Sequence, residues 1–123
     1  MTPKEQFQNK IVDLDKATAL SNLYMDVCDM LEKYEAKLTR QYNDADKTYK
    51  RLKKSGASTY KVTEALKNLV VLKHQILIEK DLRIEMLQRY RAALEENKKI
   101  KDDLISFCNQ LDAEKAEKVE DAV

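Results

Sequence analysis

Apolar side chains recur between residues 20 and 52 at alternating steps of four and three residues. This heptad spacing is typical of a long helix that packs along one face. Upstream, Thr2, Pro3 and Glu5 form the pattern of a helix N-terminus, with a capping hydroxyl, a proline and a glutamate. We therefore predict a helix over residues 3–54. Its packing seam consists of Leu20, Tyr24, Val27, Leu31, Tyr34, Leu38, Gln41, Ala45, Thr48 and Leu52.

A second heptad pattern follows in residues 86–111 and predicts a second helix over residues 59–111. Between Ile76 and Leu94 the apolar residues cover more than one helical face, whereas contact with one helix buries a single stripe. This segment is therefore expected to contact a further neighbour. Asn97 interrupts the seam, either as a polar residue that sets register or as a residue that faces solvent. The residues predicted to pack within the chain or between copies are Leu77, Ile84, Met86, Leu87, Tyr90, Leu94, Ile100, Leu104, Phe107 and Leu111.

The two helices are separated by a short segment that contains Gly56, the only glycine of the chain. Glycine commonly ends a helix in the left-handed conformation, and Ser58 or Thr59 can cap the next helix. We predict a turn over residues 55–58 between two arms of equal length. The predicted fold is an all-α, single-domain, long antiparallel helical hairpin of coiled-coil type. Because a slender hairpin buries little surface, we expect it to pack into a homo-oligomer.

The charges are distributed unevenly although the net charge is only +1. Residues 47–73 contain eight basic side chains and one acidic side chain, whereas residues 102–123 contain seven acidic and two basic ones. The hairpin should therefore have a basic tip at its turn and an acidic tail over residues 112–123. The tail is interpreted either as a solvated helix end or as a docking element.

The basic tip is the one candidate binding site. Its cations would attract phosphate groups, and tyrosine rings can stack on unpaired bases. Two other interpretations remain open: a solvated helix end, and a contact for an acidic protein partner. The candidate residues are Lys47, Tyr49, Lys50, Arg51, Lys53, Lys54, Tyr60 and Lys61.

The sequence lacks the motifs of catalytic, metal and cofactor sites. One glycine excludes a glycine-rich phosphate loop, and the single histidine, His74, has no second histidine or cysteine pair beside it. In a hairpin with equal arms, Cys28 and Cys108 would lie roughly 36 Å apart along the axis, too far for a disulfide. We therefore expect no enzyme activity, no cofactor and no metal. Two reduced thiols and the absence of a long apolar run favour a cytoplasmic protein that does not enter a membrane.

The segment Tyr49-Lys50-Arg51-Leu52-Lys53-Lys54-Ser55-Gly56 and the later Tyr90 and Phe107-Cys108 resemble phage recombination mediators of the UvsY type. That resemblance implies a helical, ring-forming protein that binds single-stranded DNA and helps to load a recombinase. The implied DNA contacts are Lys50, Arg51, Lys53 and Lys54. The chain departs from the family in its shorter segment after Ser-Gly and in its acidic C-terminus.

Two functions follow as hypotheses. The first is a non-enzymatic, oligomeric hairpin that acts as an assembly, adaptor or chaperone-type binding protein. The alternative is a single-stranded nucleic-acid-binding recombination mediator that uses the basic tip. The partners expected are therefore further copies of the chain, another protein or single-stranded nucleic acid.

Overall fold

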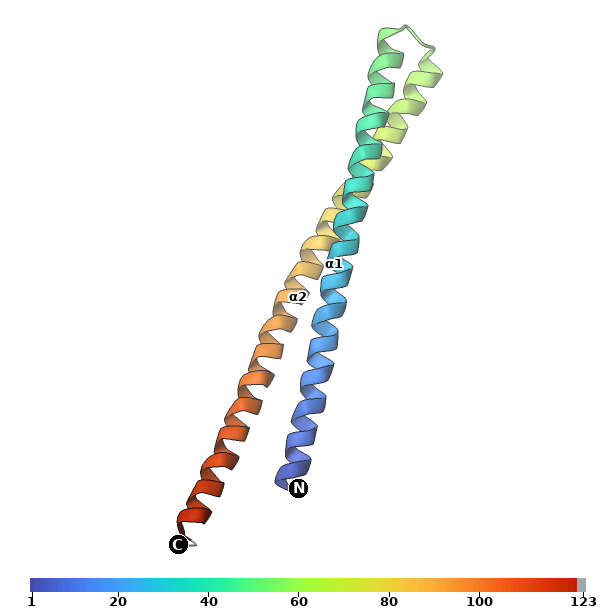
Figure 1. Cartoon of the computed structure of the whole chain (residues 1–123). Coiled ribbons are helices and arrows are strands. Elements are labelled where there is room, and N and C mark those ends of the chain that lie inside the picture. Colours follow the sequence, from blue (N-terminus) through green and yellow to red (C-terminus); the bar gives the residue numbers. More distant parts are fainter. Residues whose placement is uncertain (122–123) are drawn as a thin grey trace. The chain divides into compact units, whose positions relative to one another are not determined.

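The computed structural model describes residues 1–121, with side chains as far as Lys118. Helix α1 spans Pro3–Lys54 and helix α2 spans Thr59–Asp121. The two helices pack against each other as a helical hairpin, joined by a short turn (Figure 1). The predicted all-α hairpin is confirmed, and both predicted boundaries of the turn hold.

Helix α1 begins at the residues that the sequence indicated. The Thr2 hydroxyl accepts a hydrogen bond from the Glu5 backbone N–H over 3.2 Å. The Thr2 carbonyl accepts one from the Gln6 N–H over 3.0 Å. Thr2 is therefore the N-cap, and Pro3 takes the first helical position, where a missing N–H costs nothing.

The turn uses the backbone freedom of Gly56, whose φ is 68°. The Ala57 N–H donates to the Leu52 carbonyl over 3.2 Å, which is the six-to-one hydrogen bond of a Schellman motif. The next helix is capped by Ser58, whose hydroxyl accepts from the Lys61 N–H over 3.4 Å. Of the two cap candidates, the structure selects Ser58.

Gly56→Ala should destabilise the turn although the site has room for a methyl group. No atom lies within 4 Å of the position that a Cβ would take. The cost therefore comes from the left-handed backbone alone, and we expect the free energy of unfolding to fall by about 1 kcal/mol. Urea denaturation followed by circular dichroism measures this. Unchanged stability would contradict the role given to Gly56.

Helix α2 continues to Asp121, beyond the end predicted at Leu111. Alanine, glutamate and lysine dominate the extension, and these residues favour helix without tertiary contact. Residues 112–118 are all exposed, as expected for a solvated helix end. The side chains of Glu120 and Asp121, and residues 122–123 of the predicted acidic tail, lie outside the described part of the chain.

The chain divides into two compact units, each built from parts of both helices. The hairpin unit is Asp26–Gln88 and contains the turn. The terminal unit combines Met1–Met25 with the part of α2 that begins at Arg89.

The seam predicted for the latter half of α2 is confirmed. Met86, Tyr90, Ile100, Leu104, Phe107 and Leu111 are half-buried, and Ala93 is buried. The seam continues toward the turn with the same alternating steps of three and four residues. The residues of this part were not predicted as one seam. These residues are Val62, Ala65, Leu69, Leu72, Ile76, Glu79 and Arg83.

The seam predicted for α1 is wrong at four of its ten positions. The other six are buried or half-buried as predicted: Tyr24, Val27, Leu31, Leu38, Ala45 and Leu52. At the four wrong positions the inward residue is the next one along the chain, namely Ser21, Glu35, Tyr42 and Tyr49, and Cys28 beside Val27 is buried as well. Leu20, Tyr34, Gln41 and Thr48 are exposed instead. Ser21 fits the interior of an unbroken helix because its hydroxyl donates to the Ala17 carbonyl over 3.0 Å.

In the terminal unit, polar contacts join the two helices. Lys10 forms an ion pair with Asp103 and lies over the Phe107 ring, 5.3 Å from its centre. Asn97 donates from Nδ2 to the Thr18 hydroxyl over 3.2 Å. Asn97 is half-buried and therefore belongs to the seam rather than to the solvent face.

Neither helix contains, within the described residues, an apolar stretch suited to crossing a lipid bilayer.

Candidate interaction surfaces

The hairpin unit carries an apolar stripe on the outside of α2. We call it the outer stripe, and its members each expose between 37% and 55% of their surface. Their steps of three, four and seven residues place them on one helical face, beside but not within the seam. The members are Leu66, Val70, Leu77, Ile84 and Leu87.

The predicted packing residues fall into two groups, one exposed and one half-buried in the seam. Leu77, Ile84 and Leu87 are exposed, and so is Leu94 in the terminal unit. These four lie outside the buried seam, whereas Met86 and the later seam residues belong to it. The excess of apolar residues in this segment, noted from the sequence, therefore remains on the surface.

The other flank of the hairpin unit is also partly apolar. Met30 and Tyr34 on α1 and Ile78 and Leu82 on α2 are exposed. In the heptad frame of the buried seam they occupy the positions on the side opposite the outer stripe. The unit thus has apolar side chains on both flanks of its helix pair.

The basic tip surrounds an open depression at the end of α1. Five of the predicted cations line it together with Ser55: Lys47, Lys50, Arg51, Lys53 and Lys54.

Two further candidates, Tyr60 and Lys61 on the first turn of α2, do not line the depression, and Tyr60 is 74% exposed. Tyr49 is a half-buried seam residue, and Lys53 Nζ lies 5.9 Å from the centre of its ring. Of the two tyrosines proposed to stack on bases, only Tyr60 is freely accessible.

Lys50 differs from the other tip lysines because it has an acidic neighbour on the same helix. Its ammonium lies 2.9 Å from Asp46 Oδ2. The hydrogen bond and the charge of Asp46 raise the pKa of Lys50 above its usual value. A phosphate bound at Lys50 must therefore compete with Asp46.

A layer of charged side chains crosses the seam of the hairpin unit. We call Glu35, Glu79 and Arg83 the charged layer. Arg83 Nη1 lies 2.8 Å from Glu35 Oε2, and Lys80 Nζ lies 3.9 Å from Glu35 Oε1 at its edge. Glu79 is only 3% exposed, and neither of its carboxylate oxygens has a hydrogen-bond partner among the described residues. This layer was not predicted, although extending the α2 seam backwards from Met86 reaches Arg83 and Glu79.

The environment of Glu79 disfavours its charged form. Burial raises the pKa of Glu79, and the nearby carboxylate of Glu35 raises it further. Arg83 and Lys80 act in the opposite direction but do not outweigh the first two causes.

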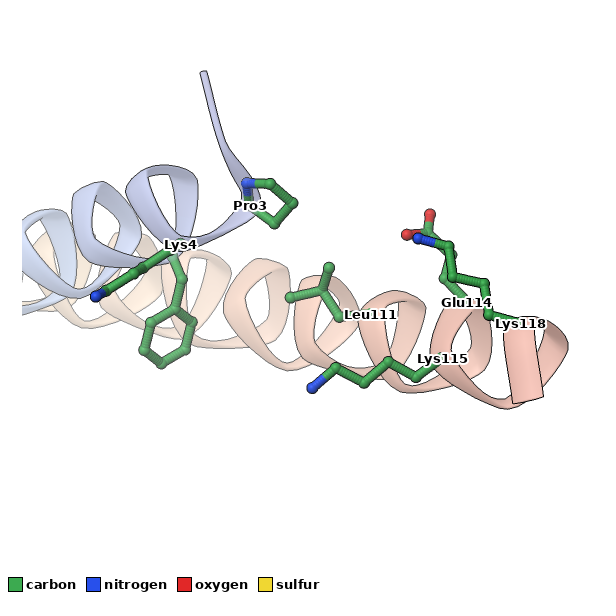
Figure 2. A pocket seen from close by; sticks show the side chains of 7 residues that line it. Pro3, Lys4, Leu111, Glu114, Lys115 and Lys118 are labelled. Atoms are coloured by element: carbon green, nitrogen blue, oxygen red, sulfur yellow. The ribbon is translucent and has the colours of Figure 1, made fainter. Parts of the chain in front are cut away.

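A small pocket opens between the helices of the terminal unit (Figure 2). Phe7 and Leu111 supply its apolar surface. Pro3 and Lys4 border it from α1, and the α2 side chains around it are Glu114, Lys115 and Lys118. Its lysines are spread along exposed helix ends and do not converge on a common point in Figure 2.

The residues considered for chemistry are the two cysteines and the histidine. Cys28 is buried in the hairpin unit and Cys108 is half-buried in the terminal unit, both as free thiols. His74 is exposed. Within the described residues, no three His, Cys, Asp or Glu side chains gather as metal ligands.

No family model matches the chain, and neither a curated protein nor a solved structure matches it.

Proposed function

We propose that the chain is a non-enzymatic helical hairpin that self-associates and serves as an assembly, adaptor or chaperone-type binding protein of the cytoplasm. The observation that carries this proposal is the outer stripe. Five large apolar side chains on one helical face form a patch of the kind that marks protein interaction sites.

The surface area supports the same proposal. The chain exposes 9629 Å² of accessible surface. A compact monomer of the same mass, 14.3 kDa, exposes about 6,800 Å². Association would remove part of this excess from water, and apolar side chains gain most from that transfer.

Light scattering over a dilution series tests self-association. At tens of micromolar we expect a mass above the 14.3 kDa of one chain, falling toward that value on dilution. A mass of one chain at every concentration, with no protein co-purifying, would reject the proposal.

The second candidate function is single-stranded nucleic-acid binding at the basic tip. It is supported by the five cations around one depression and by the accessible ring of Tyr60. The resemblance to UvsY-type mediators belongs to this candidate and stays a prediction.

Substituting Lys50, Arg51, Lys53 and Lys54 by alanine should weaken binding of a labelled oligonucleotide at least tenfold. Each lost phosphate contact should also lower the salt dependence of binding by about 0.7 in log–log slope. Fluorescence anisotropy over a salt series measures both quantities. The control replaces Lys98, Lys99, Lys101 and Lys115, which removes the same charge from other exposed positions. Equal losses in both variants, or no binding by the unmodified chain at low salt, would exclude the tip as the site.

A further inference from the structure

The segment of α2 from Ile76 to Leu87 has charged residues in its seam and apolar residues outside it. Glu79 is buried and Arg83 is half-buried, and both face α1 between the half-buried apolar residues Ile76 and Met86. Leu77, Ile84 and Leu87 of the same segment are exposed. An amphipathic helix normally places its apolar face inward. Charged side chains therefore form part of the contact with α1, while apolar side chains of the same segment face outward.

The charges of the layer are incompletely paired. From α1, the carboxylate of Glu35 faces the site; from α2, Arg83 and Lys80 face it. Both cations reach Glu35, whereas in the part of the chain that the structure describes the oxygens of Glu79 and Nε of Arg83 lack hydrogen-bond partners. A buried carboxylate without such partners opposes folding in its ionised form far more than in its neutral form.

We propose that the charged layer allows α1 and α2 of the hairpin unit to separate locally, which we call opening. Protonation of Glu79 favours the closed form, in which the two helices are in contact. The proton is taken up by a Glu79 carboxylate oxygen, which removes the negative charge beside Glu35. Arg83 and Lys80 then remain with one carboxylate between them. The outer stripe has the same heptad spacing as a seam, so an opened α2 still presents an apolar face to a partner.

The direction of the pH dependence follows from the raised pKa of Glu79. Between its usual value near 4.5 and its higher folded value, the closed form holds more protons than the open form. Closure is therefore favoured as the pH falls through this window and disfavoured as the pH rises through it.

Cys28 reports the opening because it is a buried thiol in the seam of the same unit. The experiment uses the full chain with Cys108→Ala, so that Cys28 is the only thiol. A disulfide reagent that reacts at acid and neutral pH, such as dithiodipyridine, labels Cys28 when the contact opens. Labelling rates of variants are compared with the parent chain at the same pH, which cancels the ionisation of the thiol itself.

Glu79→Gln should slow the labelling of Cys28 about tenfold at neutral pH, because the neutral amide keeps the shape and removes the buried charge. As the pH is lowered toward the usual glutamate value near 4.5, the parent should approach the rate of the variant, because its raised pKa lets Glu79 take up a proton above that value in the closed form. Glu32→Gln, at an exposed position of α1, is the matched control and should leave the rate unchanged.

Arg83→Met should have the opposite effect, since it leaves the two carboxylates without their nearest cation. We expect faster labelling at neutral pH and a larger slowing on acidification than in the parent. Circular dichroism confirms that each variant is helical.

The proposal is overturned if Cys28 is labelled as fast in Glu79→Gln as in the Glu32→Gln control. A slowing that is the same at both pH values would also overturn it, because that result indicates packing rather than protonation.

Discussion

Leu38→Ala is expected to lower the free energy of unfolding by about 2–5 kcal/mol. Leu38 is the most buried apolar side chain of the described core, with 2% of its surface exposed. Truncation removes its contacts and leaves a cavity that a continuous helix cannot easily fill. Because small domains are stable by only about 5–15 kcal/mol, the effect should be large in urea denaturation followed by circular dichroism.

Leu23→Ala is the matched control for this prediction. It makes the same chemical change on α1 at a side chain that is 57% exposed. We expect a loss below about 1 kcal/mol there. Equal losses at the two positions would show that Leu38 is not a seam residue. Both variants are compared at one protein concentration, because association shifts apparent stability.

The combination of Leu77→Lys and Ile84→Lys is expected to weaken self-association about a hundredfold or more. Both residues belong to the outer stripe, and Leu77 is 50% and Ile84 55% exposed. Two charges in a buried contact between copies cost at least several kcal/mol, which corresponds to this loss of affinity. The helix content of the separated chain should change little, so circular dichroism and light scattering together distinguish dissociation from unfolding.

The control for the stripe variant places the same two charges elsewhere on α2. His74→Lys and Gln88→Lys lie at exposed positions outside the stripe. They should leave the assembled mass unchanged. If they dissociate the protein to the same extent, net charge rather than the stripe controls association, and the proposed interface is wrong.

The turn and the latter seam of α2 could be predicted because each depends on neighbouring residues that fit only one interpretation. A single glycine after two lysines and before a serine leaves one place for the reversal, and the structure has it there. From Met86 onward, apolar residues fill every seam position but Asn97. A run of this kind allows only one heptad frame.

The α1 seam was predicted only in part because apolar residues occupy two neighbouring faces. Leu20 and Tyr34 are apolar but exposed, whereas Ser21 and Glu35 are polar but face inward. Following the apolar residues Leu20 and Tyr34 placed the seam one residue too early at these positions, and the same frame was kept at Gln41 and Thr48, although Tyr42 and Tyr49 beside them are half-buried. The inward position of Glu35 becomes evident only when Arg83 is placed opposite it.

The basic tip shows a different limit of sequence reasoning. Five of its six predicted cations line one depression and Lys61 does not. Their contacts depend on residues just outside the counted stretch or on the geometry of the seam. Asp46 precedes that stretch and pairs with Lys50 one helical turn away. Tyr49 was assigned to base stacking, yet the heptad frame turns it toward the seam. A count of charges therefore overestimates how many tip residues are free to bind.

Whether copies of the chain cover the outer stripe can be tested with a fluorescent dye sensitive to polarity. A chain with both native cysteines replaced by alanine carries one cysteine for the dye, at position 77 in the stripe or at position 74 outside it. A trace of labelled chain is titrated with unlabelled wild-type chain to tens of micromolar. We expect a blue shift of emission at position 77 and none at position 74. No shift at either position, or equal shifts at both, would contradict it.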